Sequence, residues 1–222
     1  MKRILAIAPH PDDEILGCGG TLARHVRNGD QVYVVIVTRG TPKLYKDQQI
    51  ENVRNEARAA HGIIGVKETV FLDFHAPELD ITSQADISRA LSKCIQQFKI
   101  DCLYLPHRGD IHHDHAAVFN AGLVAARPLE DYTVKQIYTY ETLSETEWAP
   151  PFGNDVFIPT VFSELTNHDF EAKIEAMKCF KSQLKSFPNP RSIDNLKALA
   201  MFRGATVGVR LAEAFMQIRS II

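Results

Sequence analysis

Short apolar segments alternate with amphipathic segments through the first 140 residues, and this alternation constrains the fold more than any other feature. Five apolar runs have the length of a strand: residues 3–8, 31–37, 69–72, 102–105 and 134–140. Between them, apolar residues recur at helical spacing in four segments: residues 14–28, 47–64, 83–98 and 116–126. Strands that alternate with helices in this way form βαβ units with a parallel sheet. We therefore predict an α/β fold with a doubly wound, mostly parallel sheet.

The pattern changes after residue 140, where prolines interrupt the chain. It predicts a short strand over 155–162, a helix over 168–184 and a last helical region over 192–219, with Gly204 and Gly208 as kinks or close-packing points. The length of 222 residues suits one domain. We predict a single domain over residues 1–222, with the α/β core in 1–140 and a C-terminal helical cap in 141–222.

The charge balance and the cysteines limit the kinds of partner and compartment. Lys and Arg number 25 against 27 Asp and Glu, a net charge of −2, so no nucleic-acid partner is expected. No apolar run approaches the roughly 20 residues that span a bilayer, so no stable membrane insertion is expected. The four cysteines form no CxxC pair, which is typical of a reduced, cytoplasmic protein. The apolar residues Ile218, Ile221 and Ile222 would permit a homo-oligomer.

A dense polar motif, Pro-His-Pro-Asp-Asp-Glu at residues 9–14, follows the first predicted strand directly. Four acidic or imidazole side chains within five positions would repel one another without a cation. His10 and Asp13 offer ligand types that suit a divalent transition metal, and Asp12 on the same tight turn could act as a base. The alternative is that the acidic residues only complement the dipole of the helix that begins there.

A second polar motif, residues 106–115, follows the fourth predicted strand and contains four of the nine histidines. In the common strand order 3-2-1-4-5, the first and fourth strands are neighbours, so the two motifs would meet where the strand order reverses. The alternative is an exposed polar loop without a function.

Two histidines and one carboxylate are the ligand set both of catalytic zinc sites and of non-haem iron oxygenases. A catalytic zinc ion lowers the pKa of water to roughly 7. A carboxylate such as Asp12 could then take the proton of the water, and a protonated His112 could stabilise the oxyanion. The residues therefore favour hydrolysis.

The two motifs together resemble the signatures of the LmbE-like, or PIG-L, family of zinc-dependent N-deacetylases, (P/A)HPDDE and HxDH. The resemblance implies that His10, Asp13 and His115 bind the metal and that Asp12 is the general base. It further implies that His112 stabilises the oxyanion or protonates the leaving amine, and that Asp114 orients a histidine. Arg54 is the nearest match to an arginine with which family members contact substrate oxygens.

We therefore expect a Rossmann-like, LmbE-like fold and a cytoplasmic, Zn²⁺-dependent hydrolase of a linear amide bond. It would release acetate from a small molecule, an N-acetylated amino sugar of the N-acetylglucosamine type or its conjugate. Fe²⁺ in place of Zn²⁺, an oxygenase, an amidase for a larger N-acyl group and a non-catalytic metal- or sugar-binding module remain open alternatives. So do the roles of His75, His107 and Asp110. Specificity is expected in the loops 38–47 and 141–155 and in the C-terminal cap.

Overall fold

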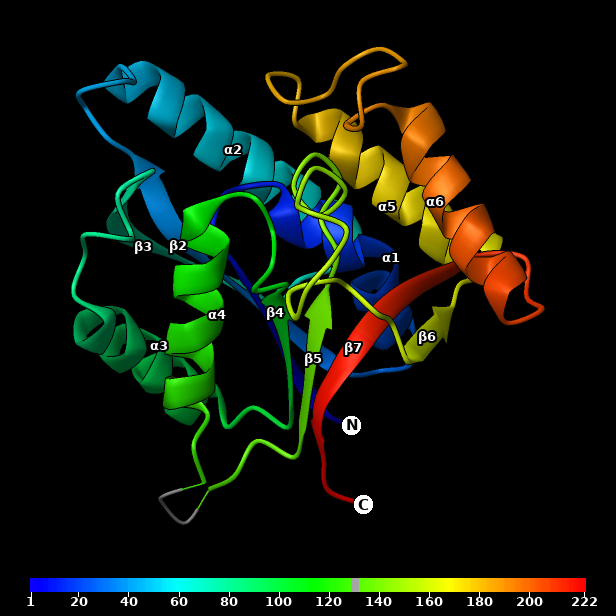
Figure 1. The fold of residues 1–222 in the computed structure, drawn as a ribbon, viewed down its shortest axis with the longest axis horizontal. Helices are drawn as coiled ribbons and strands as arrows, with labels where there is room; N and C mark the ends of the chain where they lie inside the picture. The colour runs from blue at the N-terminus through cyan, green and yellow to red at the C-terminus, as the bar shows by residue number, and fades with distance from the viewer. Residues whose placement is uncertain (129–131) are drawn as a thin grey trace.

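The computed structural model describes residues 1–128 and 132–222, which form one twisted sheet covered by helices (Figure 1). The strands are β1 (Arg3–Ala8), β2 (Gln31–Gly40), β3 (Glu68–Ala76), β4 (Cys102–Pro106), β5 (Gln136–Tyr140), β6 (Val161–Glu164) and β7 (Ala212–Ser220). The helices are α1 (Asp13–Arg27), α2 (Asp47–Ile64), α3 (Gln84–Phe98), α4 (His113–Ala125), α5 (Asn167–Cys179) and α6 (Ile193–Thr206).

The seven strands lie in the order β3-β2-β1-β4-β5-β7-β6. Strands β1 to β5 are parallel, and β7 runs antiparallel to both of its neighbours, β5 and β6. The predicted α/β class and the order 3-2-1-4-5 are therefore confirmed. Strand β1 lies between β2 and β4, so the loops that follow β1 and β4 are side by side at one edge of the sheet.

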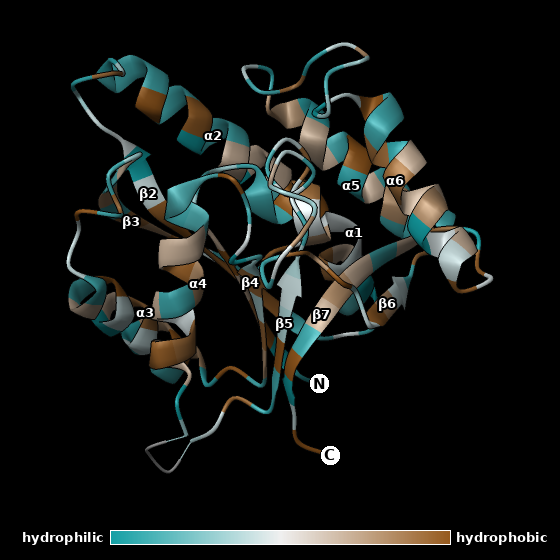
Figure 2. Ribbon diagram, in the orientation of Figure 1, coloured by the Kyte–Doolittle hydropathy of each residue, from teal (hydrophilic) through white to brown (hydrophobic). Residues whose placement is uncertain are grey.

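The core consists of two apolar layers, one on each face of the sheet. Along β1, Ile4, Ala6 and Ala8 pack in the layer with α1, α2, α5 and α6, whereas Leu5 and Ile7 pack in the layer with α3 and α4. The helices accordingly carry alternating brown and teal bands in Figure 2, as expected when an amphipathic helix buries one face. Within residues 1–128 and 132–222, no helix is long and apolar enough to cross a bilayer.

Helix α1 lies unusually close to the sheet because of its glycines. A Cβ atom at Gly17 would overlap the ring of Tyr140, and one at Gly20 would overlap Leu165. The hydroxyl of Tyr140 donates a hydrogen bond to the carbonyl of Ile7 over 2.9 Å, which fixes the ring in place. Gly17 and Gly20 therefore allow other side chains to pack closely against the backbone of α1.

The C-terminal segment differs from the expected helical cap. The prediction of a helical region over 192–219 is wrong: α6 ends at Thr206, and the chain enters β7 at Ala212. Gly208 has a φ of +76°, a left-handed conformation that ends the helical path rather than bending it. The segment after residue 141 therefore adds two strands to the sheet, in addition to α5 and α6.

Candidate active site

The first motif forms a tight turn between β1 and α1. Asp12 has a φ of 111°, and its carbonyl accepts the N–H groups of Ile15 and Leu16, which begins the helix. The backbone N–H of His10 donates to Oδ2 of Asp13 over 2.9 Å. Asp12 and Asp13 are 1% and 0% exposed, so this turn buries two adjacent carboxyl groups that need compensating partners.

The second motif forms the loop from β4 into α4. His112 precedes the first turn of α4, and its Nδ1 accepts the backbone N–H of Asp114 over 3.1 Å. His115 lies one turn into the helix and is completely buried. Because β1 and β4 are adjacent, this loop meets the first one, as the sequence predicted.

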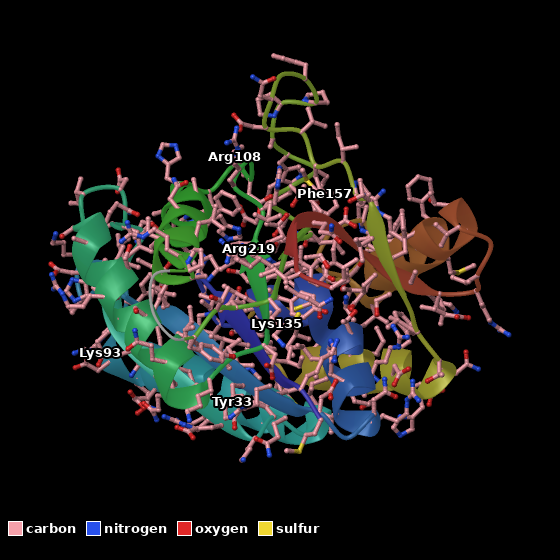
Figure 3. The ribbon with its side chains drawn as sticks, turned by 90° about the horizontal axis from the view of Figure 1, so that it is seen from below. Tyr33, Lys93, Arg108, Lys135, Phe157 and Arg219 are labelled. Carbon is pink, nitrogen blue, oxygen red and sulfur yellow. The ribbon has the colours of Figure 1, made fainter. Side chains whose placement is uncertain are left out.

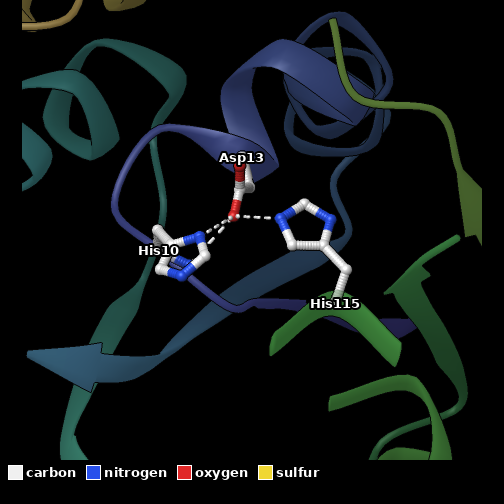
Figure 4. A group of neighbouring side chains, drawn as sticks. All are labelled: His10, Asp13 and His115. Carbon is white, nitrogen blue, oxygen red and sulfur yellow. Dashed lines mark hydrogen bonds and ion pairs between the residues drawn. The ribbon is translucent and has the colours of Figure 1, made fainter. Parts of the chain in front are cut away.

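His10, Asp13 and His115 form a cluster in which one ligand atom of each lies within 4.8 Å of the others. Oδ2 of Asp13 is 3.2 Å from Nδ1 of His10 and 3.3 Å from Nε2 of His115. Figure 4 shows the two imidazole rings on either side of the Asp13 carboxylate. The cluster therefore offers two nitrogen atoms and a carboxylate to one point.

The remaining nitrogen of each histidine is held by a second carboxylate. Nε2 of His10 lies 3.0 Å from Oδ2 of Asp114, and Nδ1 of His115 lies 2.7 Å from Oδ2 of Asp110. The second oxygen of Asp110 accepts the hydroxyl of Thr146 over 2.6 Å. Carboxylates in this position orient metal-ligating histidines and raise their basicity. Asp110, whose role the sequence left open, is thus the hydrogen-bond partner of His115.

The cluster fits a divalent metal ion. Oδ1 of Asp13 and Nε2 of His115 are buried and lack a hydrogen-bond partner among the residues that the structure describes. An unpaired buried polar atom costs about 1–3 kcal/mol, which a bound ion would remove. Burial lowers the pKa of His10, but hydrogen bonds to Asp114 and Asp13 raise it to about 9, so the carboxylates draw positive charge to this point. Two imidazoles and a carboxylate suit zinc or iron.

A second group, His10, His112 and Asp114, also meets the distance for metal binding. Both Asp114 oxygens already have partners, however: Oδ2 pairs with His10, and Oδ1 accepts the backbone N–H of Leu79 over 3.0 Å. We therefore favour the group that contains Asp13 and His115.

A cavity of about 430 Å³ opens beside the cluster. His10, Asp12 and His112 line it together with residues of β2, of α2 and of the loop that follows α5. The two loops expected to carry specificity contribute Thr38, Gly40, Tyr45 and Glu145 to its wall.

Asp12 and His112 line this cavity, and their pKa values are shifted in opposite directions. Burial raises the pKa of Asp12 to about 8, although the nearby Arg191 opposes the change. Burial and the neighbouring His10 lower the pKa of His112 to about 4. Because Nδ1 of His112 accepts a hydrogen bond, the neutral ring carries its proton on Nε2. The lowered pKa thus favours a neutral His112 ring, whose Nε2–H is a hydrogen-bond donor, over the protonated ring that the sequence predicts.

Arg54 lies outside the wall of the cavity. Its guanidinium donates to Oδ1 of Asp73 over 2.6 Å and to the carbonyl of Leu72. The charged residues that line the cavity beyond the two motifs include Arg191 and Glu145, which the sequence analysis did not select. Both lie in irregular segments without a motif, so only the folded chain reveals them.

The loop between β5 and β6 is tied to the second motif. Nε2 of His107 donates to the carbonyl of Asp155 over 2.7 Å, and the guanidinium of Arg108 pairs with the Asp155 carboxylate. Figure 3 shows Arg108 and Phe157 at the end of the molecule from which this loop projects. A Cβ atom at Gly109 would overlap the Asp155 carbonyl, so the contact requires glycine there.

Known proteins resemble this chain over most of its length. The family model "PIG-L: GlcNAc-PI de-N-acetylase" matches residues 5–126, which include both motifs. The uncharacterized deacetylase YaiS of Escherichia coli (strain K12) is 34% identical over 186 residues, covering 82% of this chain and 91% of that protein. The diacetylchitobiose deacetylase of Thermococcus kodakarensis is 25% identical, covering 96% and 82%. The solved structure of the conserved protein TT1542 from Thermus thermophilus has the same fold, with a TM-score of 0.80 and 24% identity over 100% of this chain and 97% of that one.

Proposed function

Because the chain belongs to the PIG-L family, we propose that it is a metal-dependent N-deacetylase. Its substrate would be an N-acetylated amino sugar of the N-acetylglucosamine type or a conjugate of one, and its products the free amine and acetate. One observation carries this proposal: a metal-ligand cluster, a buried carboxyl group and an imidazole donor converge on a single cavity. The similarity to a diacetylchitobiose deacetylase supports an amino sugar as the substrate.

His10, Asp13 and His115 would hold the metal, which we propose to be Zn²⁺; Fe²⁺ suits the same ligands. When bound, such an ion polarises the acyl carbonyl and makes water more acidic. Asp114 engages Nε2 of His10 and Asp110 engages Nδ1 of His115, so Nδ1 of His10 and Nε2 of His115 would be the atoms that bind the ion.

Asp12 is the proposed general base. It takes a proton from the water that attacks the acyl carbon, and it returns that proton to the amine nitrogen as the C–N bond breaks. Burial raises the pKa of Asp12, which makes its carboxylate a stronger base than that of an exposed aspartate. Nε2–H of His112 donates to the carbonyl oxygen as negative charge develops there.

The outer part of the cavity supports a hydroxyl-rich substrate. Gln49, Asn52 and Glu56 of α2 line it together with Ser182 and Gln183, and the hydroxyl of Ser182 donates to the carboxylate of Glu56 over 2.7 Å. Amide, carboxylate and hydroxyl side chains of this kind hydrogen-bond sugar hydroxyl groups.

The test measures bound metal and turnover on the same sample. Protein without a polyhistidine tag is analysed for metals, and acetate release is followed from N-acetylglucosamine, N,N′-diacetylchitobiose and N-acetylglucosaminyl-inositol. We expect bound zinc or iron, and acetate release that a chelator abolishes and added metal restores. Bound metal without release from any of these substrates would contradict the proposal and favour a larger acyl group or non-catalytic binding.

A further inference from the structure

Arg191 reaches the carboxylate of Asp12 from the other end of the chain. Its Nη1 donates to Oδ2 of Asp12 over 3.1 Å and to Oε1 of Gln183 over 2.8 Å. Its Nε donates to the hydroxyl of Ser144 over 2.8 Å, and its Nη2 lies 3.6 Å from the carboxylate of Glu145. The guanidinium is therefore fixed by four side chains in the wall of the cavity.

The backbone at Arg191 is fixed as well. Its N–H donates to Oδ1 of Asn189 over 2.9 Å, and its carbonyl accepts the N–H of Lys185 over 3.2 Å. A side chain held at both ends orients its partner and does not swing to follow a ligand.

Asp12 needs such an orienting partner. One of its oxygens, Oδ2, is bound by Arg191, whereas Oδ1 has no hydrogen-bond partner among the described residues. Of the described residues that line the cavity, Arg191 is the only arginine or lysine. Without it, the carboxylate could rotate and present either oxygen in several directions.

We propose that Arg191 is a positioning residue, which holds Oδ2 of Asp12 so that Oδ1 is aimed at the attacking water. This inference rests on the proposed role of Asp12 as the general base. The carboxylates of Asp12 and Glu145 already pair with the Arg191 guanidinium, so its charge is not free to bind a substrate. Arg191 therefore affects the rate of the chemical step and not substrate binding. The planar guanidinium makes its bonds to Asp12 and Ser144 simultaneously, which a lysine ammonium cannot reproduce.

The kinetic test compares R191M, R191K and the control R203M. Arg203 lies in the same C-terminal segment and forms a similarly buried pair with Glu141 over 2.6 and 2.8 Å, but it does not line this cavity. We expect kcat of R191M to fall about 100-fold, with KM within about twofold and an unchanged metal content. R191K should regain part of this loss, and R203M should keep the wild-type kcat per folded molecule.

Two kinetic results would overturn the inference. An increase in KM of R191M at constant kcat would make Arg191 a substrate contact. An equal loss of kcat in R203M would show that breaking any buried ion pair of this segment lowers activity, which is a structural effect.

A comparison of crystal structures tests the positioning role of Arg191 independently of the proposed function. Metal-loaded wild type and R191M are crystallised without substrate, and the Asp12 side chain is compared. We expect the Asp12 carboxylate of R191M to turn away from its wild-type orientation. If the wild type released no acetate, the proposed function would fail, yet an unmoved Asp12 in R191M would still by itself refute the positioning role.

Discussion

The carboxylate of Asp110 accepts a hydrogen bond from His115, and its replacement tests whether this contact strengthens metal binding. In the variant D110N, the amide oxygen can still accept from Nδ1 of His115 and the amide nitrogen can still donate to Thr146, so the shape is kept and only the charge is lost. Removing a carboxylate behind a metal-ligating histidine lowers metal affinity by about 10- to 100-fold. Asp110 is 7% exposed and His115 is 0% exposed, so solvent screens the lost charge poorly.

We therefore expect D110N to bind zinc about 30- to 100-fold more weakly than the wild type, or about 2–2.7 kcal/mol. Tag-free apoprotein is titrated with zinc against a chromophoric chelator of known affinity. D101N is the matched control, because Asp101 accepts the N–H of Arg3 far from the cavity. If D110N bound zinc as tightly as the wild type and D101N, the Asp110 carboxylate would not strengthen metal binding by His115.

Three further predictions concern stability, each measured by urea unfolding. G17A should lose about 1–3 kcal/mol because its Cβ overlaps the Tyr140 ring, whereas G62A, with open space in α2, should gain up to about 1 kcal/mol; equal effects would contradict this packing. K173M should lose about 3–5 kcal/mol because it leaves the buried Glu213 carboxylate without its cation, and K173M/E213Q should regain part of that loss; a double variant no better than K173M would contradict the ion-pair explanation. Burial raises the pKa of Asp169, but hydrogen bonds from Arg27 and Thr166 outweigh burial and lower it. The ionised Asp169 therefore stabilises the fold fully above the pKa of an unfolded aspartate, about 3.9, and this stabilisation is lost as the pH falls through the lower pKa of the folded state. The stability difference between wild type and D169N should therefore shrink below about pH 4, and a constant difference would contradict the assignment.

The parallel part of the fold was predictable because each of the strands β1 to β4 is followed by a helix in the sequence. Strand β1 is apolar on both faces, as a central parallel strand must be, and the order of the first five strands followed from that class. The two motifs were predictable as one site for the same reason, since adjacent parallel strands end at the same edge.

The last strand was not predictable in the same way. In β7, residues 212–215 are all buried, including Glu213, so a charged residue lies where a strand buried on both faces is usually apolar. Its pairing with β5 joins residues about 80 positions apart, for example Tyr140 with Phe215. Gly208 was the available signal, because a left-handed turn there ends a helix. Arg191 was hidden for a similar reason: its partner Asp12 is 179 positions away.

We propose different roles for two adjacent aspartates: Asp13 binds the metal, and Asp12 is the general base. The most direct measurement determines metal stoichiometry and acetate release for D12N and D13N in parallel with the wild type. We expect D12N to keep its metal and lose turnover, and D13N to lose both. A D12N variant without metal, or a D13N variant that retains both metal and turnover, would contradict these roles.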